Sequence, residues 1–297
     1  MLRVLLQELR FRRNAIIGWG LGVSVLPLIY IGLYPQIEDQ MAAFEEILEL
    51  PMYQAFGLSL TDLESYIAST VILIVPILVC IYAIINATGT LAGEEDDGRL
   101  ELIVALPIPR WQIVATKATA VAIALFLILL IVGILAAVTF AAIESQVTTT
   151  IAPGTMFFGL LYAWPIVISI AMIALFFGVF SPSRRIAALL STAVFLISYF
   201  GSNIAGMVES LESSQRFFLF HYYDATANLL TNGAQAGDII VLLVVALIAF
   251  LLAVIFFQWR DITVGVWPWQ RGKMTGGSVL ADVAERPLRE RKSAGVK

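Results

Sequence analysis

The 297-residue chain has little charge: Asp, Glu, Lys and Arg make up 13% of it, whereas hydrophobic residues make up 60%. A soluble globular protein is charged at about 25% of its residues, because its surface has to be hydrated. So low a charge excludes most soluble enzymes. The single cysteine, Cys80, and the single histidine, His221, exclude an internal disulfide and a cysteine–histidine zinc cluster. The composition is that of an integral membrane protein.

Long uncharged apolar stretches recur along the chain. A helix needs about 20 mostly apolar residues to cross the hydrocarbon core of a bilayer, where it satisfies its own backbone hydrogen bonds. The sequence therefore predicts an all-α polytopic fold with one membrane domain over residues 14–266. Its six transmembrane helices are expected at about residues 14–36, 66–88, 117–143, 155–181, 186–208 and 238–259.

The segments outside these spans have patterns of their own. Residues 1–13 have leucines on one helical face and charged residues on the other, which predicts an amphipathic helix lying in the membrane interface. Residues 211–236 are too apolar for an ordinary loop, and we expect an outer re-entrant helical hairpin there. The cytoplasmic tail, 267–297, lacks periodicity and mixes charges with Gly and Ser, which is typical of disorder.

Basic residues are distributed unevenly between the two sides of the predicted domain. With six spans, 17 of the 18 Lys and Arg residues fall on one side, and Arg216 alone falls on the other. The other side instead collects the acids of the first loop, between residues 38 and 64. Cytoplasmic loops carry an excess of Lys and Arg. We expect a multi-pass protein of the plasma membrane with both termini in the cytoplasm.

The loop between the second and third spans has an unusual pattern, GEEDDGRLELIVALPIPRWQIVATK, over residues 93–117. Acids and a glycine precede a stretch with helical periodicity that stops before Pro107, because a residue before proline disfavours the α region. Acids favour a helix N-terminus. The pattern predicts a short cytoplasmic helix at about 97–106. From the residues alone, this segment could equally well be a solvated acidic turn or a short rigid helix that inserts into a groove of a partner protein.

This stretch resembles the loop motif of the type-2 permeases of ATP-binding-cassette (ABC) transporters: acids, a glycine, Leu-Glu-Leu, a Leu-Pro pair, then Arg and Lys. The segments at 221–224, His-Tyr-Tyr-Asp, and at 257–262, Phe-Gln-Trp-Arg-Asp-Ile, resemble the same family. The resemblance covers about residues 1–266. Arg99 departs from it where Thr is more frequent, and Trp259 where Arg is common.

The resemblance implies the membrane subunit of an ABC exporter. In that family the loop helix couples the membrane part to a separate ATPase subunit, and two permeases work with two ATPases. It therefore implies an ATP-binding-cassette ATPase dimer, a second copy of this chain and membrane lipid as partners, and no nucleic acid. The residues that it assigns to ATPase coupling are Glu94, Glu95, Gly98, Arg99, Leu100, Glu101, Leu106, Pro107, Arg110 and Lys117.

The sequence offers no nucleotide site of its own. A phosphate-binding loop needs a Gly five residues before the Gly of a Gly-Lys pair, and Gly272-Lys273 has Trp267 at that position. We therefore expect no catalytic residue, cofactor or metal site in this chain, with ATP bound by the partner. Two alternatives remain: a membrane-embedded enzyme that uses His221 and Asp224 on the outer face, or a non-transporting membrane anchor for an ATPase.

Polar groups inside the predicted spans are few and uncharged, which argues against an ion-coupled carrier and favours a lipophilic or amphipathic cargo. Side chains that could line a pathway are Asn86, Ser198, Ser202 and Asn203. Each of them could instead bond to a carbonyl of its own helix.

Small residues and prolines mark special points within the spans. Gly18 and Gly22 form a small-x-x-x-small pair, which we expect to serve packing inside the chain rather than contact with a second copy. Pro27, Pro76 and Pro165 are expected to kink their helices.

Overall fold

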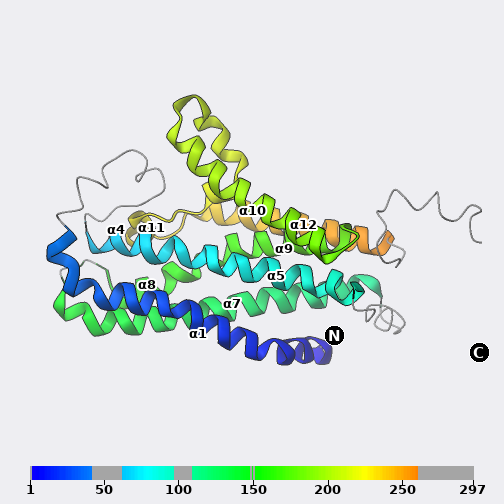
Figure 1. The fold of residues 1–297 in the computed structure, drawn as a ribbon, viewed down its shortest axis with the longest axis horizontal. Helices are drawn as coiled ribbons and strands as arrows, with labels where there is room; N and C mark the ends of the chain where they lie inside the picture. Colours follow the sequence, from blue (N-terminus) through cyan, green and yellow to red (C-terminus); the bar gives the residue numbers. More distant parts are fainter. Residues whose placement is uncertain (1, 42–61, 97–108, 148, 150, 260–297) are drawn as a thin grey trace, which may run out of the picture.

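The computed structural model describes residues 2–41, 62–96, 109–147, 149 and 151–259. Every regular element among these residues is a helix, and six helices are long and apolar enough to cross a membrane (Figure 1). They run over Val4–Ile37, Leu63–Glu94, Arg110–Gln146, Pro153–Phe180, Arg184–Met207 and Ala236–Trp259. The predicted all-α polytopic membrane fold is thus confirmed. The predicted spans at 14–36 and 117–143 begin earlier in the structure.

The spans are built from the following elements. They are α1 (Leu2–Met41), α4 (Leu63–Ile67) with the π-helical turn η1 (Ala68–Ile72) and α5 (Ile74–Asp96), α7 (Arg110–Ile143) with the 3-10 turn η2 (Glu144–Gln146), α8 (Pro153–Leu161) with α9 (Trp164–Phe180), α10 (Arg184–Met207) and α12 (Ala236–Trp259). Two 3-10 segments, η3 (Glu209–Phe217) and η4 (Leu219–Tyr222), and the short α11 (Ala227–Asn232) connect α10 to α12.

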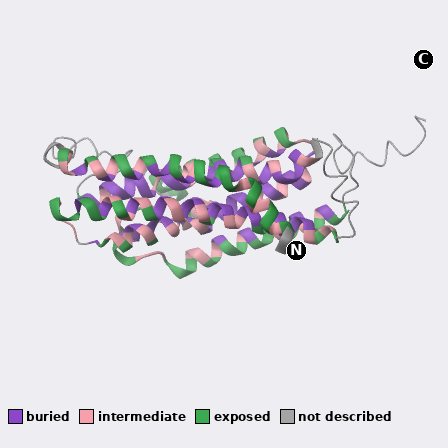
Figure 2. Ribbon diagram, turned by 90° about the horizontal axis from the view of Figure 1, so that it is seen from below, coloured by how far each residue is buried: buried purple, intermediate pink, exposed green. Residues whose placement is uncertain are grey.

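Helix α9 lies at the centre of the bundle and packs against α5, α7, α10 and α12. Its residues are apolar on all sides, which is typical of a helix buried on all sides. The long helices lie side by side, with buried residues toward the interior and exposed ones outside (Figure 2). Many outward side chains are also apolar, such as Val138 (61% exposed) and Leu247 (55% exposed). This is the surface that lipid requires.

The two ends of the bundle differ in charge. The start of α1, the end of α5 and the starts of α7 and α10 meet at one end, which we call the basic end. The described basic side chains there are Arg10, Arg12, Arg13, Arg110, Lys117, Arg184 and Arg185. The opposite, acidic end has Asp62, Glu64, Glu144, Asp224 and Asp238. The predicted charge asymmetry therefore holds among the described residues.

The N-terminal segment does not form a separate interfacial helix. Helix α1 runs without a break from Leu2 to Met41, so the segment predicted at 1–13 is the first part of the first long helix. The reason is tertiary, because Glu8 and Arg12 are held by side chains of α5 and α7.

The proline at position 76 changes the second span. Proline has no N–H, and its ring excludes the carbonyl of the residue four positions earlier, here Ile72. The helix widens into the π turn of η1 just before this point, with Leu73 N donating to the carbonyl of Ala68. The freed carbonyl of Ile72 accepts a hydrogen bond from the Tyr223 hydroxyl at 2.9 Å. A distant tyrosine thus satisfies the polar group that the proline exposes.

The other two prolines behave differently from each other. Pro165 follows the break at Tyr162 and Ala163 that divides the fourth span into α8 and α9, as predicted. Pro27 lies inside α1, which continues as one helix on both sides of it.

The segment after α10 forms a hairpin, but not the one predicted. Both legs were expected within 211–236, whereas the structure uses the second half of α10 as one leg and η3 as the other. This arm, residues 201–218, projects from the side of the bundle (Figure 1). Close approach is possible because Gly201 faces the Phe218 ring and Gly206 faces the Gln215 amide, where a Cβ atom would collide with either.

The glycines of α1 do not pack as predicted. Gly20 is buried against Ile131 of α7, and a Cβ there would lie 2.8 Å from the Ile131 Cδ1 atom. Gly18 and Gly22 are exposed, with no atom within 4 Å of the Cβ that either would carry. The internal contact is thus made by the glycine between the predicted pair.

Replacing Tyr223 by Phe should destabilise the protein, because it leaves the buried Ile72 carbonyl without a donor. The expected loss is about 1–3 kcal/mol in the free energy of unfolding. Tyr222→Phe is the matched control, since its hydroxyl donates to the exposed carbonyl of Arg216. Thermal unfolding in detergent should show a lower midpoint for Tyr223→Phe only. Equal midpoints for the two variants would contradict the role given to Tyr223.

Gly20→Ala should weaken the packing of α1 on α7. Overpacking lowers the free energy of unfolding by about 1–3 kcal/mol. The better helix propensity of Ala offsets about 1 kcal/mol of this loss. Gly18→Ala keeps only the propensity gain, so its unfolding midpoint should stay level or rise. Adding Ile131→Ala to Gly20→Ala should remove the steric conflict. A Gly20→Ala protein as stable as Gly18→Ala would show that the contact is not tight.

Candidate functional site

Charged side chains meet where α5 ends and α7 begins, on either side of residues 97–108. Lys117 of α7, whose side chain is 4% exposed, places its Nζ 2.6 Å from Oε1 of Glu94 on α5 and 3.2 Å from Oε1 of Glu8 on α1. A buried ammonium group is tolerated only when opposite charges and hydrogen bonds surround it. Lys117 therefore fixes the ends of three helices relative to one another.

Arg12 extends this arrangement along α1. Its guanidinium donates to Oδ1 of Asn86 and, at 3.0 Å, to Oγ1 of Thr90, and it lies 3.5 Å from Oε2 of Glu8. Asn86 in turn donates to the Tyr82 hydroxyl at 3.0 Å. Two carboxylates face two cations, so the group has no net charge. We call Glu8, Arg12, Asn86, Thr90, Glu94 and Lys117 the polar cluster.

The acids after Gly93 lie in the last turn of a helix. Helix α5 continues to Asp96, so Glu94, Glu95 and Asp96 form its last turn. Negative charge at a helix C-terminus opposes the macrodipole. For Glu94 the ion pair with Lys117 offsets this cost.

The structure places three of the predicted coupling side chains. Glu94 and Lys117 pair within the polar cluster, and Arg110, at the start of α7, lies with Nη1 3.5 Å from the carbonyl oxygen of Gln258 on α12. Glu95 lies in the last turn of α5, and its side chain is outside the described part. The predicted helix at 97–106, with Gly98, Arg99, Leu100, Glu101, Leu106 and Pro107, also lies outside the described residues.

A second basic residue connects α10 to the end of α5. The guanidinium of Arg184 lies against Gly89, where a Cβ would be 3.1 Å from its Nη2 atom, and its Cδ lies near Gly93. It also donates to the carbonyl of Ile85 at 3.4 Å. Because Gly89 and Gly93 have no side chains, the Arg184 side chain can pack directly against the backbone of α5.

The predicted pathway residues fall in two separate places. Asn86 belongs to the polar cluster at the basic end. Ser198 accepts hydrogen bonds from the backbone amides of Leu219 and Phe220, at 2.7 and 3.4 Å, and so joins α10 to η4. Ser202 and Asn203 line a cavity beside the arm. The four residues thus lie in different parts of the structure, and their role in a pathway stays a prediction.

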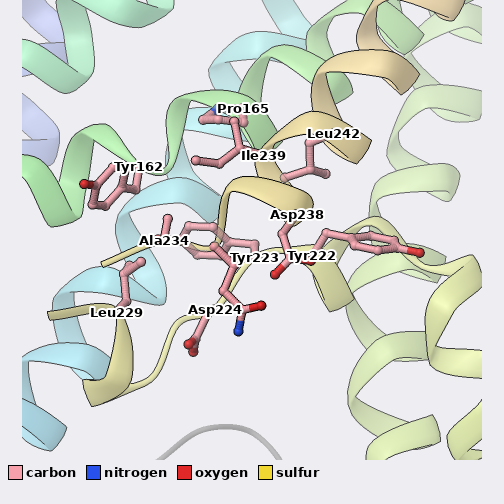
Figure 3. A pocket seen from close by; sticks show the side chains of 11 residues that line it. Tyr162, Pro165, Tyr222, Tyr223, Asp224, Leu229, Ala234, Asp238, Ile239 and Leu242 are labelled. Atoms are coloured by element: carbon pink, nitrogen blue, oxygen red, sulfur yellow. The ribbon is translucent and has the colours of Figure 1, made fainter. Parts of the chain in front are cut away.

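The cavity beside the arm has a volume of about 590 Å³. Helix α10 contributes Tyr199 to its lining, and the start of α12 contributes Asp238. The connection from η4 to α11 supplies His221 and Asp224. Both carboxylates also border a smaller pocket of about 10 Å³ (Figure 3).

Tyr223, between these two spaces, is the buried tyrosine that donates to Ile72. Burial, with the charge of Asp224 beside it, raises the pKa of the Tyr223 phenol well above its usual range. The hydroxyl therefore keeps its proton and remains a donor.

His221 and Asp224 contact different partners. The Asp224 carboxylate accepts from the backbone amide and hydroxyl of Thr226, at 2.9 and 2.6 Å, and from the Asn228 side chain at 2.9 Å. The His221 ring packs edge-on against Tyr222, with ring centroids 5.0 Å apart. No hydrogen bond joins the histidine to the aspartate among the residues that the structure describes. Asp224 thus stabilises the turn that leads into α11.

Residues 7–258 match the protein family described as "Multidrug efflux system permease Rv1217c, C-terminal domain". The chain belongs to this family. It is accordingly a multi-pass membrane permease, with six helices apolar enough for the spans. No curated protein matches the chain. The match supports the expected transporter permease, while membership of the type-2 class stays a prediction.

Sequence reasoning missed half of the polar cluster of the permease. The sequence does not single out Glu8, Arg12 or Thr90, because residues 1–13 predict an interfacial helix with a solvated polar face. A weak signal was available: Glu8 and Arg12 are four residues apart, so both lie on one helical face. Nothing in the sequence indicates that this face meets Lys117, which is 109 residues away.

Lys117→Met should destabilise the permease, because it leaves Glu94 and Glu8 partly buried without their shared cation. Breaking a buried pair costs about 3–5 kcal/mol, and the lower end is expected because these two side chains are about a fifth exposed. Arg10→Gln, at an exposed position of α1, should leave the unfolding midpoint in detergent unchanged. Neutralising both acids as well, with Glu8→Gln and Glu94→Gln, should restore most of the loss. An unshifted midpoint for Lys117→Met alone would contradict this account of the cluster.

Proposed function

We propose that this permease is the membrane-spanning subunit of an ATP-driven exporter, and that a separate ATP-binding-cassette ATPase dimer drives it. The observation that carries the proposal is the family match over residues 7–258, on a chain with six spans. The matched family is described as part of a multidrug efflux system, which favours export and a range of cargoes. The sequence has no phosphate-binding loop, so the ATP site is assigned to the partner.

The ATPase is proposed to engage the loop at 97–108. Both helices that enter and leave this loop are anchored at its ends: α5 by Glu94 and α7 by Lys117, in one ion pair. Glu8 joins α1 to the same pair, and Arg184 joins α10 to the last turns of α5. A displacement of the loop would thus be transmitted to α1, α5, α7 and α10 through short polar contacts.

Helix α5 is the proposed lever. It runs without interruption over 23 residues, which at 1.5 Å per residue is about 35 Å. Next to its other end, the Ile72 carbonyl is bound to Tyr223, which lines the cavity beside the arm. Movement of the α5 end in the basic region is therefore mechanically connected to the wall of that cavity.

The energy needed sets a condition on this coupling. To shift an inward–outward equilibrium from 1:99 to 99:1, the ATP-bound partner must favour one state by about 5.5 kcal/mol. A ligand can shift the equilibrium only through a difference in its affinity for the two states. The contacts of the loop and the polar cluster must therefore differ between the two states of the transporter.

A second copy of the permease completes the proposed assembly. Gly18 and Gly22 lie one turn apart on the exposed face of α1, with open space beside them. Glycines at this spacing let two membrane helices approach closely. We assign this face to contact between copies. The excess of Lys and Arg at the basic end supports a plasma-membrane orientation with both termini in the cytoplasm.

Glu101→Lys should uncouple ATP hydrolysis from transport. The charge reversal lies in the loop proposed to meet the ATPase, and Glu101 is not a member of the polar cluster. We would reconstitute the permease with its ATPase in vesicles and measure ATP-dependent dye export together with hydrolysis. Export should fall at least tenfold while unstimulated hydrolysis continues. Glu45→Lys, the same change in the first loop on the opposite side, is the control and should export normally.

Two results would overturn the proposal. The first is wild-type coupling in Glu101→Lys, which removes the role of the loop. The second is translocation by the purified permease alone, without ATPase or ATP. If cargo never stimulates hydrolysis and no export occurs, the chain is instead a membrane anchor for the ATPase.

A further inference from the structure

We infer that the cavity beside the arm binds organic cations with an apolar body. The inference deepens the proposed function and rests on it for the identity of these cations as cargo. Binding itself does not depend on the ATPase. The volume of about 590 Å³ falls within the range of about 300–1,000 Å³ that is usual for small-molecule sites.

The charge of the cavity has one sign. Asp224 and Asp238 are the carboxylates among the described residues that line it, and that lining includes no Lys or Arg. Arg216, the basic residue of this region, is exposed and lies outside the lining. A wall with two acids and no base attracts cations and repels anions, most strongly where the surroundings exclude water.

Asp238 is the carboxylate available to a ligand. It is half-buried in the first turn of α12, where the helix dipole favours its negative charge. It accepts no side-chain hydrogen bond from any residue that the structure describes, whereas Asp224 is occupied by Thr226 and Asn228. A half-buried carboxylate has lost part of its hydration, and a ligand cation would replace that loss.

The other walls suit an apolar cation more than a metal ion. Tyr199, Phe220 and Tyr223 bring aromatic rings to the cavity, with Tyr199 and Phe220 in edge contact at 5.3 Å. Aromatic faces attract organic cations such as quaternary ammonium groups. No group of three metal-ligating side chains occurs among the described residues, so the cavity lacks the ligand set that a bare divalent ion needs.

The cavity also connects the parts that the transport cycle would move. Its lining includes residues of the arm, Asp238 of α12 and Leu73, which follows η1. A change in the angle of the arm would change the distance between Asn203, which belongs to the arm, and Asp238. Affinity for the cation would then depend on the position of the arm.

Two probes of the same shape and opposite charge test the inference. Tetraphenylphosphonium and tetraphenylborate would be measured by equilibrium dialysis against the full-length permease in nanodiscs, with binding to protein-free nanodiscs subtracted. The cation should bind saturably and the anion should not. Asp238→Asn should weaken cation binding at least tenfold, and Asp238→Glu should retain most of it. Glu212→Gln removes an exposed carboxylate of η3 outside the cavity lining, and it should change nothing.

Several results would overturn the inference. They are equal binding of the two probes, undiminished cation binding by Asp238→Asn, or an equal loss in Glu212→Gln. The unfolding midpoint of each variant, together with the recovery in Asp238→Glu, separates loss of the site from loss of the fold.

Failure of the site and failure of the proposed function give different results. If ATP-dependent export is unchanged in Asp238→Asn, the cation site is rejected as the cargo site and the proposed exporter function stands. If cation binding depends on Asp238 but the permease with its ATPase never exports, the cation site stands and the proposed exporter function is rejected.

Discussion

A lysine ammonium held between two carboxylates determines how the basic end of this permease is assembled. Lys117 cannot be buried without Glu94 and Glu8, and these two acids belong to different helices. The pairing therefore fixes α1 and α5 on α7, and it explains why α1 extends as one helix past its predicted start. It also makes the last turn of α5 acceptable, although acids there oppose the helix dipole.

The same requirement, that no polar group stay unsatisfied in an apolar interior, organises the acidic end. Pro76 frees the carbonyl of Ile72, and the Tyr223 hydroxyl takes the place of the missing amide. Ser198 accepts from the amides of Leu219 and Phe220 where the chain returns from the arm. These hydrogen bonds attach the connection between α10 and α12 to the rest of the bundle. They also position the aromatic and acidic walls of the cavity.

The two polar sites are placed near opposite ends of α5. One contains charges that cancel, which suits a joint between moving helices. The other keeps a free carboxylate, Asp238, which suits a ligand. In the proposed cycle the first receives the force of the ATPase and the second responds through α5 and the arm. The arm itself has few contacts with α12, and its tip is highly exposed, with Phe217 at 86%.

The sequence by itself determined the number and order of the spans, the charge asymmetry and the position of the loop that resembles an ABC permease. These follow from local properties, since an apolar run of sufficient length has to be a helix in lipid. It could not relate Glu8 to Lys117 or Tyr223 to Ile72, because these partners are 109 and 151 residues apart. It also could not show that Gly20 packs inside while Gly18 and Gly22 face outward. Only the tertiary structure decided these points, because lipid and protein interior are equally apolar, and hydrophobicity alone does not distinguish a face that meets a helix from one that meets lipid.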